Sequence, residues 1–276
     1  MSSFAQRAII TFTLGPLAIF FIYLGGFFYA IPLAFVLAVA AVEFSQMGNN
    51  LGWKTSPWVL VPLVLPFFVV GWWRELDLLG PVTLVALLVV MAHALWLYEV
   101  KKDQSAPATW MAMIGGVMLI GWMGSHFFSL RNIGEMAWQW TMLAMLTTWV
   151  ADSGAYVVGK FLAGNILGKH RLSPRLSPNK TVEGYVGGII IGTAFAIGLA
   201  YFVELPWIGA LIIGLLVTIL SPLGDLGISL LKREAGVKDS GTIFRGHGGA
   251  LDRVDSLVWS VTIAFYIVLF YQRFGN

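Results

Sequence analysis

Apolar positions follow one another in long runs along the whole chain, and short polar segments separate these runs. A helix needs about 20 predominantly apolar residues to cross the hydrocarbon core of a bilayer. Pro and Gly inside such a run are tolerated where neighbouring helices satisfy the freed backbone groups. Runs of this kind predict nine transmembrane helices, at 8–24, 28–47, 57–73, 79–98, 109–130, 137–159, 184–203, 206–224 and 254–272.

The composition strengthens this prediction. Mean hydropathy is +0.81, with 58% hydrophobic and only 11% charged residues, which is typical of an integral membrane protein. No small-residue cleavage site follows the run at 8–24, so we expect it to be retained rather than removed as a signal peptide. We predict an all-α, polytopic transmembrane helical bundle that forms a single membrane domain over 1–276. Within it, 1–135 provides scaffold spans and 136–276 carries both long polar loops.

The distribution of basic residues predicts the orientation. Short cytoplasmic loops carry an excess of Lys and Arg. With nine spans, one side keeps only Arg74, Arg131 and Arg273 of the 17 basic residues, and the other side collects the rest. This places the N-terminus and both polar loops in the cytoplasm. The net charge of +3 suits anionic lipid or a polyphosphate, and because we find no nucleic-acid motif we predict no nucleic-acid partner. The chain has no cysteine, which excludes disulfides and Cys-ligated metal.

The polar loop before the span at 184–203 is a candidate anion site. Its end offers hydroxyl, amide and ammonium donors at Ser177, Asn179, Lys180 and Thr181, just before a helix start. Free backbone N–H groups and the helix dipole favour phosphate at such a position. The alternative is that Asn179 or Thr181 simply caps the helix. Asp152, on the preceding apolar span, is a functional candidate because intramembrane carboxylates are rare; pairing with a neighbouring basic side chain is the alternative.

Carboxylates in and near the second polar loop form a candidate metal site. Asp252 and Asp255 are three residues apart at the predicted start of the last span, and on one helix this spacing places both on the same face. Asp225 is a third carboxylate, at the end of the span at 206–224. Oxygen ligands without cysteine suit Mg²⁺ held by one or two carboxylates plus substrate phosphates.

The same loop also contains features suited to binding phosphate. His247, Gly248 and Gly249 allow close backbone approach to a ligand, since Gly adopts conformations that other residues avoid. Positive charge for phosphate oxygens comes from four residues, Lys232, Arg233, Lys238 and Arg253. An interfacial ion-pair network with snorkelling side chains is the alternative, and it suits Lys232 and Arg233.

Together these residues resemble a known signature. Ser229-Leu-Leu-Lys232-Arg233, Lys238-Asp239, His247-Gly248-Gly249 and Asp252-Arg253-Val254-Asp255, in this order and spacing, are similar to the signature of the phosphatidate cytidylyltransferase (CDP-diacylglycerol synthase) family. ADSGAY at 151–156, GKHRLSP at 168–174, SPNKTVEG at 177–184 and GDL at 224–226 extend the resemblance over roughly the C-terminal half. The N-terminal half adds only Glu43, in AVEFSQM.

The resemblance implies a function in phospholipid biosynthesis. A phosphate oxygen of phosphatidate attacks the α-phosphorus of CTP with Mg²⁺, giving CDP-diacylglycerol and pyrophosphate. A second cation and a homodimer stay open. The implied location is the bacterial inner membrane, with the active site on the cytoplasmic side and membrane lipid as a partner. The implied catalytic residues are Asp225, Lys238, Asp252 and Arg253, and the implied metal ligands are Asp225, Asp252 and Asp255. The implied substrate-binding residues are Asp152, Ser177, Asn179, Lys180, Thr181, Lys232, Arg233, Asp239, His247, Gly248 and Gly249.

Other functions stay open at this point. A CTP-dependent lipid kinase would transfer the γ-phosphate of CTP, and a polytopic transporter would use several spans without catalysing a reaction. The chain departs from the family pattern at Ile228, Arg245 and Ala250 and in a longer turn at 160–168. These departures leave an inactive or specialised paralogue open and bear on rate and nucleotide contacts. The sequence indicates neither the acyl-chain preference nor whether dCTP is accepted.

Overall fold

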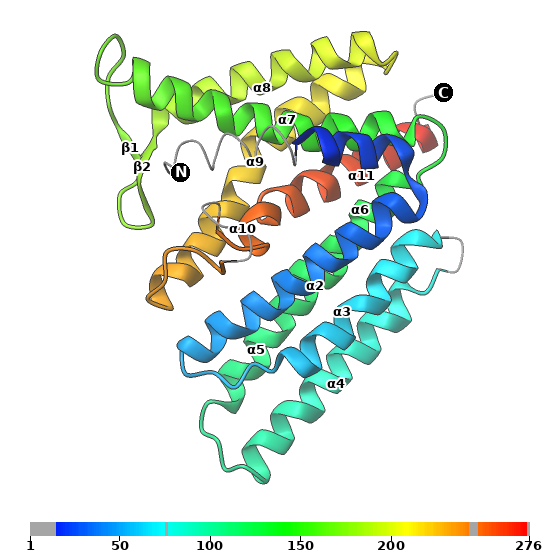
Figure 1. Cartoon of the computed structure of the whole chain (residues 1–276), viewed down its shortest axis with the longest axis vertical. Helices are drawn as coiled ribbons and strands as arrows, with labels where there is room; N and C mark the ends of the chain where they lie inside the picture. Colours follow the sequence, from blue (N-terminus) through cyan, green and yellow to red (C-terminus); the bar gives the residue numbers. More distant parts are fainter. Residues whose placement is uncertain (1–14, 75–76, 243–247, 275–276) are drawn as a thin grey trace. The chain divides into compact units, whose positions relative to one another are not determined.

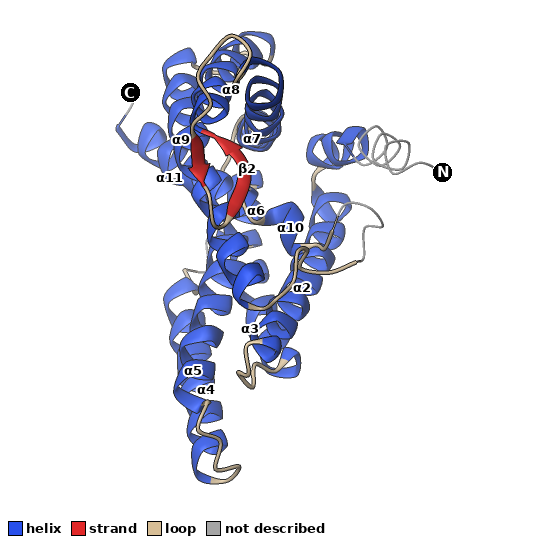
Figure 2. Cartoon of the chain, turned by 90° about the vertical axis from the view of Figure 1, so that its left-hand side faces the viewer, coloured by secondary structure: helices blue, strands red, loops and turns tan. Residues whose placement is uncertain are grey.

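The computed structural model describes residues 15–74, 77–242 and 248–274, which are mostly helical (Figures 1 and 2). The chain divides into two compact units. Unit 1 comprises 1–132 and 231–254, and unit 2 comprises 133–230 and 255–276. Both units therefore combine two separate segments of the chain. Each unit is described by itself.

Unit 1 is a helical bundle. After a helix at Gly15–Leu24, its elements are α2 (Gly26–Asn50), α3 (Pro57–Trp72), α4 (Leu79–Glu99), α5 (Ala106–Gly116), the π-helix η2 (Val117–Trp122), α6 (Met123–Arg131) and the short α10 (Leu251–Val254). Phe67 and Phe127 are fully buried in its core. Gly71 of α3 lies directly against the backbone of Ser125 in α6, so these two helices meet at their backbones.

Arg131 connects α6 to the first described helix. Its Nε donates to the carbonyl of Ile22 at 2.7 Å, and its Nη2 donates to the carbonyl of Tyr23 at 3.1 Å. The last carbonyls of a helix lack intrahelical partners and need donors of this kind. Gly25, which follows the helix at a φ of 64°, leaves room for the guanidinium where any other residue would place its Cβ. An arginine thus completes the end of the Gly15–Leu24 helix.

Unit 2 contains α7 (Ala137–Val157), the π-helix η3 (Val158–Leu162), a hairpin of β1 (Arg171–Ser173) and β2 (Ser177–Thr181), α8 (Val182–Phe202), α9 (Trp207–Glu234) up to Leu230, and α11 (Leu257–Phe274). Three glycines of α8, spaced four residues apart, face its neighbours. Gly184 and Gly188 lie against carbonyls of α7, and Gly192 lies against Ala151 and Thr218. Small residues at this spacing let membrane helices approach closely.

The predicted helical, membrane-type architecture fits the structure, which is mostly helical with one short β-hairpin in unit 2, and the chain is an integral membrane protein by its helices. The predicted spans from 28–47 onwards coincide with helical segments, and the first coincides with the helix Gly15–Leu24 over its described part, while residues 8–14 of this span lie outside the described residues. Six helical segments there are long and apolar enough to cross a membrane by length and composition. The count of nine spans and the cytoplasmic N-terminus stay predictions. One boundary was wrong: the prediction ended the eighth span at residue 224, but α9 continues to Glu234 and places Asp225 and Lys232 on a helix. The hairpin before α8 was expected only as a loop.

Candidate functional site

The β-hairpin of unit 2 leads directly into the N-terminus of α8. Its antiparallel register pairs Arg171 with Thr181 and Ser173 with Ser177. Glu183, in the first helical turn, accepts a hydrogen bond from the backbone N–H of His170 at 3.1 Å, and its Oε1 lies 2.6 Å from His170 Nδ1. These contacts hold the start of β1 against the start of α8. The end of β2 is therefore fixed at a helix N-terminus, where anions are favoured.

Lys180 and Asp225 form the ionic centre of this region. The Lys180 ammonium donates to Asp225 Oδ2, and Asp225 Oδ1 lies 3.5 Å from Ser229 Oγ, one helical turn further along α9. The side chains of Lys180 and Asp225 are 32% and 29% exposed, so water and ligands can reach both. We call Lys180, Asp225 and Ser229 the hairpin cluster. It joins residues that are 45 positions apart in the sequence.

Thr181 caps α8, as one of the two sequence interpretations expected. Its Oγ1 accepts a hydrogen bond from the backbone N–H of Gly184 at 3.0 Å. Because Thr181 follows Lys180 directly, the cap also holds the backbone that carries this lysine. Of the other residues predicted here, Asn179 is exposed on β2, Ser177 is half-buried at its start, and Asp152 is exposed on α7.

We expect Thr181→Ala to lower the free energy of unfolding by about 1 kcal/mol, the usual effect of losing a hydroxyl N-cap. Thermal unfolding of the detergent-purified protein measures this as a lower midpoint. Thr181→Ser keeps the hydroxyl and serves as the matched control, with a midpoint near that of the wild type. Equal midpoints for the Ala and Ser variants would show that the cap does not stabilise α8.

The second group of polar residues lies in unit 1, around Asp252. Asp252 Oδ1 accepts a hydrogen bond from the ammonium of Lys232 at 2.6 Å, and the two side chains are only 7% and 10% exposed. Asp252 Oδ2 accepts from the backbone N–H groups of Ser240 at 2.8 Å and Gly249 at 2.9 Å. The carboxylate of Asp252 thus connects Lys232, at the end of α9, with Ser240 and Gly249.

A residue of the N-terminal half completes this arrangement. Glu43 of α2 accepts hydrogen bonds from Ser240 Oγ at 2.8 Å and from the backbone N–H groups of Ala250 at 3.0 Å and Leu251 at 2.9 Å. The prediction noted Glu43 only through a slight resemblance, and Ser240 was missed. The sequence feature that could have indicated a role for Glu43 is its position as a single carboxylate within an apolar run. We call Glu43, Lys232, Ser240, Gly249 and Asp252 the loop cluster.

The expected common helical face of Asp252 and Asp255 is wrong. The helix α10 ends at Val254, and Asp255 lies in the turn before α11. There its Oδ1 accepts a hydrogen bond from the backbone N–H of Ser256 at 2.7 Å. The spacing argument failed because it assumed that Asp252 and Asp255 lie on one continuous helix at the start of the last span. The short α10 and the turn after it break that helix.

The remaining predicted residues differ in their surroundings. The side chains of Arg233, Lys238, Asp239 and Arg253 are exposed in unit 1. Gly248 has a φ of 81°, a conformation that glycine adopts readily. His247, like Arg245, lies outside the described residues. Lys232 is buried against Asp252 rather than exposed to solvent, so its ammonium serves this carboxylate.

The carboxylates differ in how well they suit Mg²⁺, which is usually held by one or two carboxylates plus substrate phosphates. Asp225 suits this role because its side chain is part-exposed and its Oδ1 has only a long contact to Ser229. Both oxygens of Asp252 already accept hydrogen bonds. In the described parts of the chain, no three acidic or histidine side chains gather closely enough to hold a metal. The magnesium ligands stay a prediction, and of the three predicted carboxylates Asp225 is the best suited to hold Mg²⁺.

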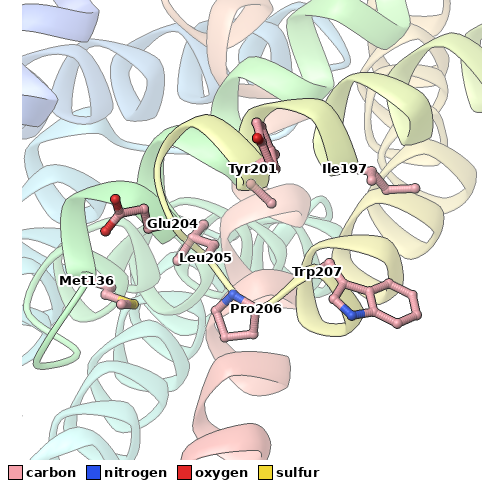
Figure 3. Close-up of a pocket in the computed structure, with 8 residues that line it drawn as sticks. Met136, Ile197, Tyr201, Glu204, Leu205, Pro206 and Trp207 are labelled. Carbon is pink, nitrogen blue, oxygen red and sulfur yellow. The ribbon is translucent and has the colours of Figure 1, made fainter.

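An apolar pocket of about 630 Å³ lies at the other end of α8 (Figure 3). Ile197 and Tyr201 of α8, together with Pro206 and Trp207 at the start of α9, line it, and Glu204 is its acidic residue. The 21 residues of α8 span about 30 Å, so this pocket is far from Lys180. The apolar side chains that line this pocket do not suit the charged phosphates of a nucleoside triphosphate. The hairpin cluster is therefore the better candidate for phosphate chemistry in unit 2.

Comparison with known proteins decides the family. The model of the cytidylyltransferase family matches residues 5–271, which is nearly the whole chain. The chain belongs to the cytidylyltransferase family. The hairpin cluster and the loop cluster both lie within the residues that match the cytidylyltransferase family.

Several curated relatives of this cytidylyltransferase-family chain are phosphatidate cytidylyltransferases. The protein of Bacillus subtilis is 40% identical over 155 residues, which cover 55% of this chain and 56% of the relative. That of Staphylococcus saprophyticus is 32% identical over 234 residues, covering 82% of this chain and 84% of the relative. That of Synechocystis is 38% identical over 177 residues, covering 59% and 57%. The first and third matches span little more than half of the relatives' length.

Proposed function

We propose that this protein transfers the cytidylyl group of CTP to phosphatidate, producing CDP-diacylglycerol and pyrophosphate. Its family and its phosphatidate cytidylyltransferase relatives support this assignment. The observation that carries it is the hairpin cluster, in which the end of β2 holds Lys180 against Asp225 at the N-terminus of α8. The ammonium of Lys180 suits the phosphates of a triphosphate, and the carboxylate of Asp225 suits the Mg²⁺ that accompanies them.

The chemistry requires positioning more than covalent catalysis. A phosphate oxygen of phosphatidate forms a bond to the α-phosphorus of CTP, and the bond from that phosphorus to the bridging oxygen of the β-phosphate breaks. Pyrophosphate leaves with the electron pair. A phosphate monoester is largely dianionic at neutral pH, so the nucleophile needs no protein base. The protein must hold two polyanions in line and stabilise the charge that develops.

Individual residues have distinct proposed roles. The Lys180 ammonium stabilises negative charge on the phosphates of CTP, and Asp225 and the cap at Thr181 hold it in place. Lys238 and Arg253 are both exposed, and we propose that they contact phosphate oxygens of the substrates. Asp252 organises the backbone of the segment that contains Gly248 and Gly249.

Magnesium is part of this proposal. Asp225 is the side chain best placed to hold Mg²⁺ together with substrate phosphates, and Asp252 and Asp255 stay predicted ligands. When bound, the ion would neutralise charge on the triphosphate. A second cation and a homodimer are further predictions of the family resemblance.

The proposed location is the bacterial cytoplasmic membrane with the reaction on its inner side. Six apolar helical segments support an integral membrane protein. The orientation follows from the excess of basic residues in the polar loops. Phosphatidate and CDP-diacylglycerol, whose acyl chains prefer the hydrocarbon core, would stay in the bilayer throughout.

A labelling experiment tests the function. Detergent-purified protein is incubated with phosphatidate, Mg²⁺ and CTP labelled either in cytosine or in the γ-phosphate, and the lipid is then extracted into organic solvent. We expect cytosine label in the lipid and γ-label in released pyrophosphate. The γ-label in lipid would instead indicate a lipid kinase. Neither label in lipid would contradict both enzymatic assignments and favour a transporter or an inactive paralogue.

A further inference from the structure

Glu43 is an unusual residue for its position. It is the only charged side chain of α2, a 25-residue apolar helix, and it is only 4% exposed. Burying a carboxylate in an apolar environment is costly unless hydrogen bonds or a counter-charge compensate. Among the described residues, no Lys, Arg or His forms an ion pair with it. Its compensation must come from the hydrogen-bond donors around it.

Those donors all belong to the segment 240–251. Ser240 Oγ donates to Glu43 Oε2, the N–H of Leu251 donates to the same oxygen, and the N–H of Ala250 donates to Oε1. Ala250 and Leu251 are at the start of α10, which packs against α2 (Figure 1). Hydrogen bonds to a charged acceptor are about twice as strong as neutral ones. Glu43 therefore holds both described ends of this segment.

The glycines of the segment give a second, independent indication. A Cβ on Gly241 would overlap the carboxylate of Glu43, and a Cβ on Gly249 would overlap both this carboxylate and Ser240 Oγ. The sequence suggested that the glycine pair allows close approach to a ligand. For Gly249, the group that approaches is the side chain of Glu43. Ala250, where the family pattern has a larger apolar residue, is 1% exposed in the same place.

The contacts of Glu43 continue into those of Asp252. Ser240 Oγ donates to Glu43 and lies 3.3 Å from the backbone N–H of Asp252, which donates to it. The backbone N–H of Ser240 donates to Asp252 Oδ2. Ser240 thus links the two carboxylates, and loss of either one would release an end of the segment.

We propose that Glu43 is a positioning residue for cytidylyl transfer, which anchors Ser240 and the stretch 248–251 and thereby holds Asp252 and the backbone of Gly248 and Gly249 for CTP. This inference rests on the proposed function. Glu43 does not contact substrate in this role and acts only through the segment it holds.

Kinetics of Glu43→Gln test the proposal. The amide places an N–H donor where Glu43 accepts from backbone N–H groups, so the anchor is lost at nearly constant volume. We expect kcat/KM for CTP to fall about 100-fold, as for other displacements of about 1 Å remote from the chemistry. The KM for CTP should rise while the KM for phosphatidate stays unchanged. The matched control is Ser45→Ala on the same helix, because Ser45 is fully buried and its Oγ has no hydrogen-bond partner in the described structure.

A thiol probe measures the anchor independently of activity. The chain has no cysteine, so Ala250→Cys introduces a single thiol at a position that is 1% exposed. We expect a water-soluble maleimide to react slowly with this variant and with its combination with Ser45→Ala. Adding Glu43→Gln should accelerate the reaction. If the wild-type chain fails to transfer cytidylyl groups, the proposed function falls while the thiol probe still tests the anchor.

Two results would overturn the inference. One is unchanged thiol reactivity in the Glu43→Gln background. The other is a variant whose KM for CTP is unchanged and whose kcat falls only in proportion to the folded fraction, since this would assign Glu43 to stability alone. If Glu43→Gln does not fold, Ser240→Ala decides by the same two measurements, because it removes one hydrogen bond to Glu43 and leaves the carboxylate satisfied by Ala250 and Leu251.

Discussion

Asp252→Asn is expected to abolish cytidylyl transfer and to destabilise the protein. The substitution leaves the ammonium of Lys232 without its counter-charge in a place where both side chains are at most 10% exposed. Removing one partner of a buried ion pair typically costs about 3 to 5 kcal/mol. The Asn amide can keep one acceptor for Ser240 and Gly249, but its NH₂ group then faces the ammonium. Turnover of CTP and the thermal unfolding midpoint in detergent measure the two effects.

Companion variants separate charge from function. Lys232→Met combined with Asp252→Asn removes both charges of this buried pair, so its unfolding midpoint should be higher than that of Asp252→Asn alone, while its activity stays lost. Glu99→Gln, at an exposed acid in the same unit, should change neither. Wild-type turnover by folded Asp252→Asn would exclude Asp252 from the reaction and refute its metal assignment. An unchanged midpoint would show that the ion pair contributes no stability.

Lys180→Met is expected to have the second largest effect, and mainly on rate. The methionine side chain keeps the length of the lysine stem and removes the ammonium that is proposed to stabilise phosphate charge. Removing one such electrostatic group typically lowers kcat about 100- to 1000-fold. The ion pair with Asp225 is about 30% exposed on both sides, so its loss should change the free energy of unfolding by less than about 1 kcal/mol.

The control for this variant lies in the same hairpin. Arg175 is an exposed basic residue between β1 and β2, and Arg175→Met removes the same charge from the same loop. We expect it to leave kcat close to wild type. Equal losses for both variants would mean that the general positive potential of the loop matters rather than Lys180. A large drop in the unfolding midpoint of Lys180→Met would assign the residue to stability.

The sequence was sufficient for the helices and for the family. Long apolar runs predict helices at a bilayer because backbone groups in lipid must be satisfied within the segment. The polar motifs could also be recognised from the sequence, since the family signature is largely contiguous between Ser229 and Asp255. Helix ends were less predictable. Hydropathy falls at residue 224, but the backbone of α9 continues through polar turns to Glu234, because polar residues such as Lys and Glu are good helix formers.

Which acid meets which base was decided by tertiary structure alone. The sequence supplied Lys180, Asp225, Lys232 and Asp252 as a shared inventory for phosphate and metal. The fold pairs Lys180 with Asp225 and Lys232 with Asp252, and it brings Glu43 to donors about 200 positions away. The local pattern of apolar and polar residues indicates where a helix forms and which of its residues lie within the bilayer. Contacts between distant residues depend on how the helices pack, and no local pattern contains that information.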